Sequence, residues 1–173
     1  MAFGIDDTLM AAAAAISLTD TLVQTVKAYR KKGVQLDIER LIEEVRVTAL
    51  QRLDEADLAL AQFERTLKEK GIDLDRTLED VINTTPWWHP FEQHRLKRIR
   101  WSFNALADAT YGASDDIAAL VKCREQTREM GIAVVESAKA KHDLYSRLLN
   151  AKSVTEKIDL LRNELVRQKK ALY

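Results

Sequence analysis

An apolar seam in the first half of the chain constrains the fold more than any other feature. Its members are Leu53, Ala56, Leu60, Phe63 and Leu67. They advance by three and four positions in turn, an average period of 3.5. This period is typical of helices that pack at shallow angles in a bundle or coiled coil. We therefore predict one long helix over residues 36–70, which ends before Gly71.

The scarcity of turn-forming residues extends this prediction to the whole chain. Only 5 Gly and 2 Pro occur among 173 residues, and no stretch alternates between apolar and polar positions as a strand does. A hydrophobic fraction of 46% excludes a disordered chain. We predict an all-α fold, a single domain over residues 1–173 that forms an elongated bundle of four to five helices. The predicted helices span residues 6–32, 36–70, 73–82, 90–111, 115–150 and 153–172.

Two polar segments mark the starts of the later helices. Ser114 is followed by two Asp residues, which is typical of an N-cap with an acidic first turn. Ser153 and Glu156 have the spacing of a capping box. Gly112, just before the first of these segments, is either a break or a weak point within one very long helix.

The N-terminal sequence indicates a cytoplasmic protein. Asp6 and Asp7 stand where a signal peptide carries positive charge. The apolar run from Leu9 to Ile16 has only eight residues, far fewer than the ~20 that span a bilayer. The single Cys excludes a disulfide framework within the chain and fits a reducing compartment.

The residues that carry chemistry do not form a catalytic or metal-binding motif. Cys123 lies between Lys122 and Arg124, which favours a thiolate, but no motif supplies it with a base. His89 and His94 are five positions apart and do not share one helical face. No glycine-rich phosphate loop is present. We expect no enzyme activity, no cofactor and no metal.

The first predicted helix combines an alanine-rich half with a basic end. Five consecutive Ala residues permit close approach of neighbouring helices. The cations that close the helix are Lys27, Arg30, Lys31 and Lys32. An apolar segment followed by such cations can bind an anionic membrane leaflet. The same segment can equally be a core helix, and the two interpretations are compatible if the helix is packed at rest and released later.

The most distinctive segment spans residues 87–101, which contain all three Trp residues and two of the three His residues. Its aromatic and basic members are Trp87, Trp88, Trp101, Arg95, Lys97, Arg98 and Arg100. Interleaved aromatic and basic residues suit an anionic lipid surface or the stacking of nucleic-acid bases. The alternative is that Trp87 and Trp88 plug the end of the bundle while the cations are solvated. The zero net charge of the chain argues against nucleic acid.

The zero net charge is the sum of unequal parts. Residues 1–32 carry a net +1, residues 33–80 a net −6 and residues 81–173 a net +5. The acidic second helix can therefore attract the C-terminal half within the bundle or a neighbouring copy in an oligomer.

In order and pattern, residues 3–150 resemble HeLo and HeLo-like domains. The N-terminal part of the resemblance is Gly4-Ile5, the apolar helix through Ala11–Ile16 and its amphipathic end. A charged second helix and the basic-Trp-Phe stretch Leu96–Phe103 follow in the same order. The architecture also occurs in fungal immune receptors, mixed-lineage kinase-like pseudokinases and plant powdery-mildew resistance proteins. The sequence up to Tyr173 contains no receptor, kinase or prion segment, which leaves two alternatives, an excised domain or a stand-alone effector whose trigger lies elsewhere.

The resemblance implies a bundle that oligomerises, exposes its N-terminal helix and permeabilises membranes in cell death or immune defence. It assigns insertion to Phe3, Ile5, Leu9, Met10 and Ile16. It assigns lipid contact to Lys27, Arg30, Lys31 and Lys32. The main hypothesis is a self-associating, membrane-active effector domain. The alternative is a non-enzymatic scaffold that binds a protein partner through the seam from Leu53 to Leu67.

Overall fold

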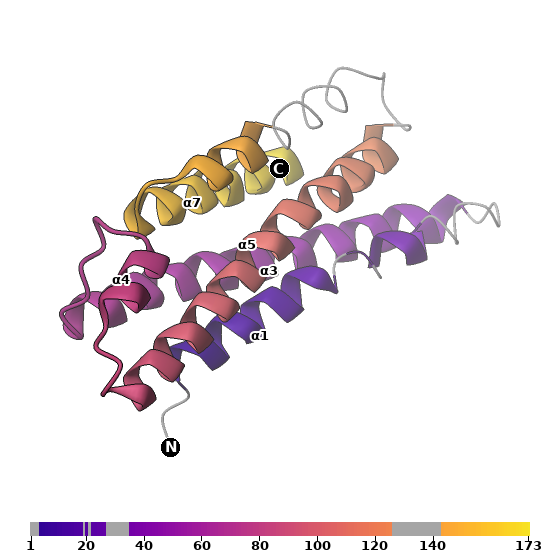
Figure 1. Ribbon diagram of the computed structural model, residues 1–173. Coiled ribbons are helices and arrows are strands. Elements are labelled where there is room, and N and C mark those ends of the chain that lie inside the picture. Colours follow the sequence, from indigo (N-terminus) through magenta and orange to yellow (C-terminus); the bar gives the residue numbers. More distant parts are fainter. Residues whose placement is uncertain (1–3, 19, 21, 27–34, 126–142) are drawn as a thin grey trace.

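The computed structural model describes residues 4–18, 20, 22–26, 35–125 and 143–173, with the side chains of 35–39 and 123–125 excepted. The fold is all-helical, and the described residues include no strand. The helices are α1 (Ile5–Ser17), α3 (Gln35–Glu69), α4 (Leu78–Thr84), α5 (Pro90–Glu125) and α7 (Val154–Leu172) (Figure 1). Residues 22–26 and 143–150 are helical as well. The prediction of an all-α protein is confirmed.

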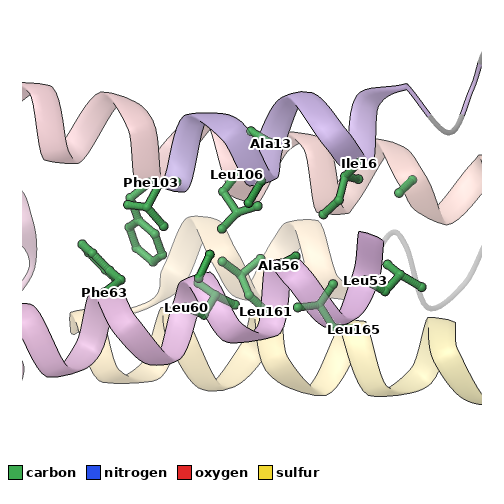
Figure 2. Packing of buried hydrophobic residues seen from close by; sticks show 14 of the residues in the cluster. Ala13, Ile16, Leu53, Ala56, Leu60, Phe63, Phe103, Leu106, Leu161 and Leu165 are labelled. Carbon is green, nitrogen blue, oxygen red and sulfur yellow. The ribbon is translucent and has the colours of Figure 1, made fainter. Parts of the chain in front are cut away.

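The apolar seam of α3 lies inside the fold. Its five residues are buried, and Phe63 stacks on Phe103 of α5 with ring centroids 4.7 Å apart. Figure 2 shows residues of α1, α3, α5 and α7 pointing into one shared interior, with Ile16 from α1 and Leu161 from α7 among them. Burial of each large apolar side chain stabilises the fold by about 1.5–3 kcal/mol. The seam therefore holds the helices of one chain together.

The first helix belongs to this core. It lies beside α5 and runs in the same direction, and it also packs on α3 (Figure 1). Leu9, Ala12, Ala13 and Ile16 form its buried stripe. Small Ala side chains bring the helix backbones close, as the alanine run predicts. α1 ends at Ser17, earlier than the predicted residue 32, and residues 27–34 lie outside the described part of the chain.

The end of α3 and the segment that follows it differ in part from the prediction. Gly71 ends α3 with φ +71, and the Ile72 N–H donates to the Leu67 carbonyl, as in a Schellman cap. The helix predicted over 73–82 is wrong at its start. The Asp75 N–H donates to the Asp73 carboxylate, and this local bond competes with a helical one. Thr77 then caps α4, which begins at Leu78.

Of the two alternatives at Gly112, the structure has the continuous helix, because α5 runs from Pro90 to Glu125 without the helix ends expected at 111 and 115. Gly112 is a helical position within it. Ser114 is buried and accepts a hydrogen bond from Arg167 at 2.9 Å, so it is not an N-cap. Burial of Ala113 and Ile117, which follow Gly112 in the helix, offsets the ~1 kcal/mol that a glycine costs in a helix.

The Ser153 N-cap at the start of α7 is confirmed, but the reciprocal bond of a capping box goes one residue earlier, to Lys152. The Ser153 hydroxyl accepts from the Glu156 N–H at 3.1 Å, and the Glu156 carboxylate accepts from the Lys152 N–H at 2.8 Å. The Val154 and Thr155 N–H groups donate to carbonyls of the segment before α4. These bonds fix the start of α7 beside the end of α3.

Candidate functional site

The tryptophans do not plug the end of the fold, because their side chains face solvent. Trp87 and Trp88 lie in the turn between α4 and α5 and are 80% and 63% exposed. Phe91 and Trp101 of α5 are 90% and 66% exposed. We call these four residues the aromatic end. Large apolar side chains that are exposed together typically mark a binding surface.

Cations lie among these aromatic residues on α5. Arg95, Lys97 and Arg98 are exposed and Arg100 is partly exposed. Arg98 forms an ion pair of 2.8 Å with Asp6 in the first turn of α1. The other three cations form no ion pair within the described residues. Positive charge and exposed aromatic area therefore coincide.

Lys70 is a further cation at this surface, and the sequence did not indicate it. Burial lowers the pKa of Lys70, the charge of Arg95 lowers that pKa further, and Asp6 raises it in part. These three residues come from the ends of three different segments, so only the packed fold brings their charges together. The one signal in the sequence is that Lys70 immediately precedes the helix-ending Gly71.

The residues predicted to insert into a membrane are mostly covered. Leu9 and Ile16 are fully buried against neighbouring helices, and Ile5 and Met10 are partly buried. Phe3 and the cations Lys27, Arg30, Lys31 and Lys32 lie outside the described residues. The stretch Ile5–Val26 is long and apolar enough to cross a bilayer by length and composition, a test that a buried core helix also passes.

Farther along α5, an open groove of about 760 Å³ is lined by this helix and by residues of the segment 16–24. Its floor is lined by small residues of α5, namely Ala105, Ala109, Gly112, Ala113 and Ala119. Its carboxylates are Asp20, Asp108, Asp115 and Asp116. The groove is therefore acidic, whereas the start of the same helix is basic.

A polar cluster joins α7 to α5 on the other side of the molecule. The buried Glu164 carboxylate accepts two hydrogen bonds from Arg167, at 2.8 and 2.6 Å, and one from Gln168. Gln168 also donates to the Thr110 carbonyl. The bond to Glu164 raises the pKa of Arg167. The cluster is buried by packing helices, so we assign it a structural role in fixing their register.

No group of three or more potential metal ligands occurs among the described residues. His89 and His94 are exposed, and the side chain of Cys123 lies outside the described set. Neither a family model, a curated protein nor a solved structure matches the chain.

Proposed function

We propose that this protein is a self-associating, membrane-active effector domain of the cell-death or immune-defence type. In this proposal the protein is an elongated bundle of four to five helices. It resides in the cytoplasm and is recruited to anionic membranes. The aromatic end and its cations bind the membrane first, and α1 then leaves the core and inserts.

The exposure of four large aromatic side chains beside Arg95, Lys97 and Arg98 carries this proposal. Each base near an anionic leaflet contributes about 1 kcal/mol, so three bases contribute about 3 kcal/mol together. Indole rings favour the headgroup region, where their apolar faces leave water while the N–H keeps a polar partner. Binding of this kind requires no unfolding.

Insertion of α1 is a separate step with its own cost. Leu9 and Ile16 must leave the core, and each loses about 1.5–3 kcal/mol of burial energy if it enters water. A membrane reduces this cost, because hydrocarbon replaces the lost apolar surroundings. The lipid phosphates also compete with Asp6 for Arg98, which weakens the attachment of α1 at its first turn.

The scaffold alternative requires that the seam from Leu53 to Leu67 be exposed to a partner. The seam from Leu53 to Leu67 is buried within the chain and is not available to a partner helix. A scaffold function would need another surface, such as the exposed Trp87 and Trp88, whose ring centroids lie 5.8 Å apart.

Vesicle co-sedimentation tests the proposal. We expect the protein to sediment with vesicles of phosphatidylcholine and phosphatidylserine and to stay in solution with phosphatidylcholine alone. The double variant Trp87→Ala/Trp88→Ala should lose most of this binding and keep its helical circular dichroism. Leu58→Ala, which removes an exposed side chain of α3, is the matched control. Absence of binding by the wild-type protein contradicts the proposal.

A further inference from the structure

One face of α5 changes in charge and side-chain size along its length. In the first half, Phe91, His94, Arg98 and Trp101 follow one another at helical spacings of three and four, and all four are exposed. The same spacing continues through Ala105, Asp108 and Gly112 into the groove. One helix surface is thus aromatic and basic at its start, and small and acidic farther on.

The acidic half has the shape to receive a helix that carries large side chains. Nothing lies within 4 Å of the position that a Cβ atom would occupy at Gly112. The neighbouring floor residues are Ala, so a second backbone can approach closely. Asp108 is exposed at the edge of this floor, and Asp20 lies across the groove from α5.

We propose that two copies of this chain pair through this face, with their α5 helices antiparallel and related by a twofold axis. With the axis between Ala105 and Asp108, Trp101 of each copy lies over Gly112 of the other. The same register places Lys97 and Arg98 opposite Asp115 and Asp116. The large and basic half of each helix then covers the small and acidic half of its partner.

Twofold symmetry is the reason for choosing a second copy as the occupant. An isologous interface forms every contact twice, so each complementary pair of surface halves contributes two sets of favourable contacts. Here both halves lie on one continuous helix, at nearly equal numbers of residues from a common midpoint. Like charges repel in the parallel arrangement, and therefore the charge pattern selects the antiparallel one.

This pairing also has a consequence for membrane binding. Trp101, Lys97 and Arg98 cannot contact lipid while they face a second copy, so pairing and membrane binding compete. The pairing rests on the self-association in the proposed function and gives it an interface. It is measured without lipid, so failure of the pairing is distinguished from failure of membrane binding.

Charge reversal tests the pairing by sedimentation velocity. Lys97→Glu places a carboxylate opposite Asp115 and Asp116, and Asp115→Lys places an ammonium opposite Lys97 and Arg98. Each variant alone should dissociate at least about tenfold more readily than the wild-type dimer, because like charges then face each other twice. An equimolar mixture of the two variants should recover the dimer, because each mixed pair restores opposite charges at both sites.

Controls separate pairing from general charge and folding effects. Lys152→Glu and Glu55→Lys make the same changes at exposed positions outside the interface and should not affect pairing. Gly112→Leu should weaken the dimer about tenfold or more, because the Leu side chain fills the space that Trp101 of the second copy occupies. The same change raises helix propensity. The proposal is overturned if the wild-type protein is monomeric, if the reversals do not weaken pairing, or if the mixture does not recover it.

Discussion

Arg98 of α5 lies 2.8 Å from Asp6 in the first turn of α1, and this ion pair connects the basic surface to the helix predicted to insert. The Asp6 side chain is largely covered, whereas Arg98 remains open to solvent. A lipid phosphate can therefore reach the guanidinium without unfolding the protein. The pair is a direct physical link between binding at one surface and release of α1.

Substitution of Asp6 by Asn should make α1 easier to release. Because the pair is partly exposed, its loss should lower the free energy of unfolding by only about 0.2–1 kcal/mol in urea denaturation. Dye release from phosphatidylserine vesicles should nevertheless become faster than with the wild-type protein. Asp7→Asn, at the exposed neighbouring position, is the control and should leave both measurements unchanged. Equal leakage rates for the two variants would contradict the proposed link.

Substitution of Leu9 by Ala should test whether α1 belongs to the resting core. Leu9 is fully buried, and a Leu-to-Ala change in such a site costs about 2–5 kcal/mol through lost transfer energy and a cavity. The free energy of unfolding from a urea titration measures this cost. A loss below about 0.5 kcal/mol would mean that α1 is not packed as described.

A charge on the exposed side of α1 separates insertion from folding. Ala14 is exposed, so Ala14→Glu should leave the free energy of unfolding within about 0.5 kcal/mol of the wild-type value. In a bilayer, a carboxylate near the helix centre costs about 2.5–3.5 kcal/mol on insertion scales. Dye release should therefore fall steeply while vesicle binding persists. Ala14→Gln is the uncharged control, and undiminished leakage by the Glu variant would exclude insertion of α1.

Substitution of Arg167 by Ala should destabilise the packing of α7 against α5. Its guanidinium is the charge partner of Glu164, whose side chain is almost fully buried. Because Arg167 is partly exposed and Gln168 still donates to Glu164, its loss should cost about 1–3 kcal/mol, less than removal of one partner from a fully buried pair. Thermal and urea unfolding of Arg167→Ala measure the loss. Arg162→Ala, which breaks more exposed pairs on the same helix, should cost about 1 kcal/mol or less.

Local signals in the sequence predict much of this fold. The 3.5-residue seam and Gly71 give the extent of α3, and the Ser153 hydroxyl gives the start of α7. These features depend on interactions within a few residues, so the helix ends that they set can be predicted without tertiary structure. The continuity of α5 through Gly112 cannot be predicted in this way, because it depends on burial of nearby residues and on a hydrogen bond from Arg167 to Ser114.

The candidate site also has a part that the sequence predicts and a part that only the folded structure shows. The aromatic and basic residues of 87–101 are evident from their density in the sequence. Their exposure is not, because Trp residues can equally plug the end of a fold. Lys70 and the acidic groove come from segments that are distant in sequence, and only the packing of α1, α3 and α5 assembles them.

Tryptophan fluorescence tests the central claim most directly, because all three Trp residues of the chain lie in the aromatic end. Trp87 and Trp88 precede α5 and lie outside the proposed pairing face, so their exposure predicts red-shifted emission and efficient quenching by acrylamide in solution. On addition of phosphatidylserine-containing vesicles, binding of this surface should give a blue shift and protection from acrylamide, with neither change for phosphatidylcholine vesicles. Emission and quenching that stay unchanged with the anionic vesicles would contradict binding of this surface to membranes.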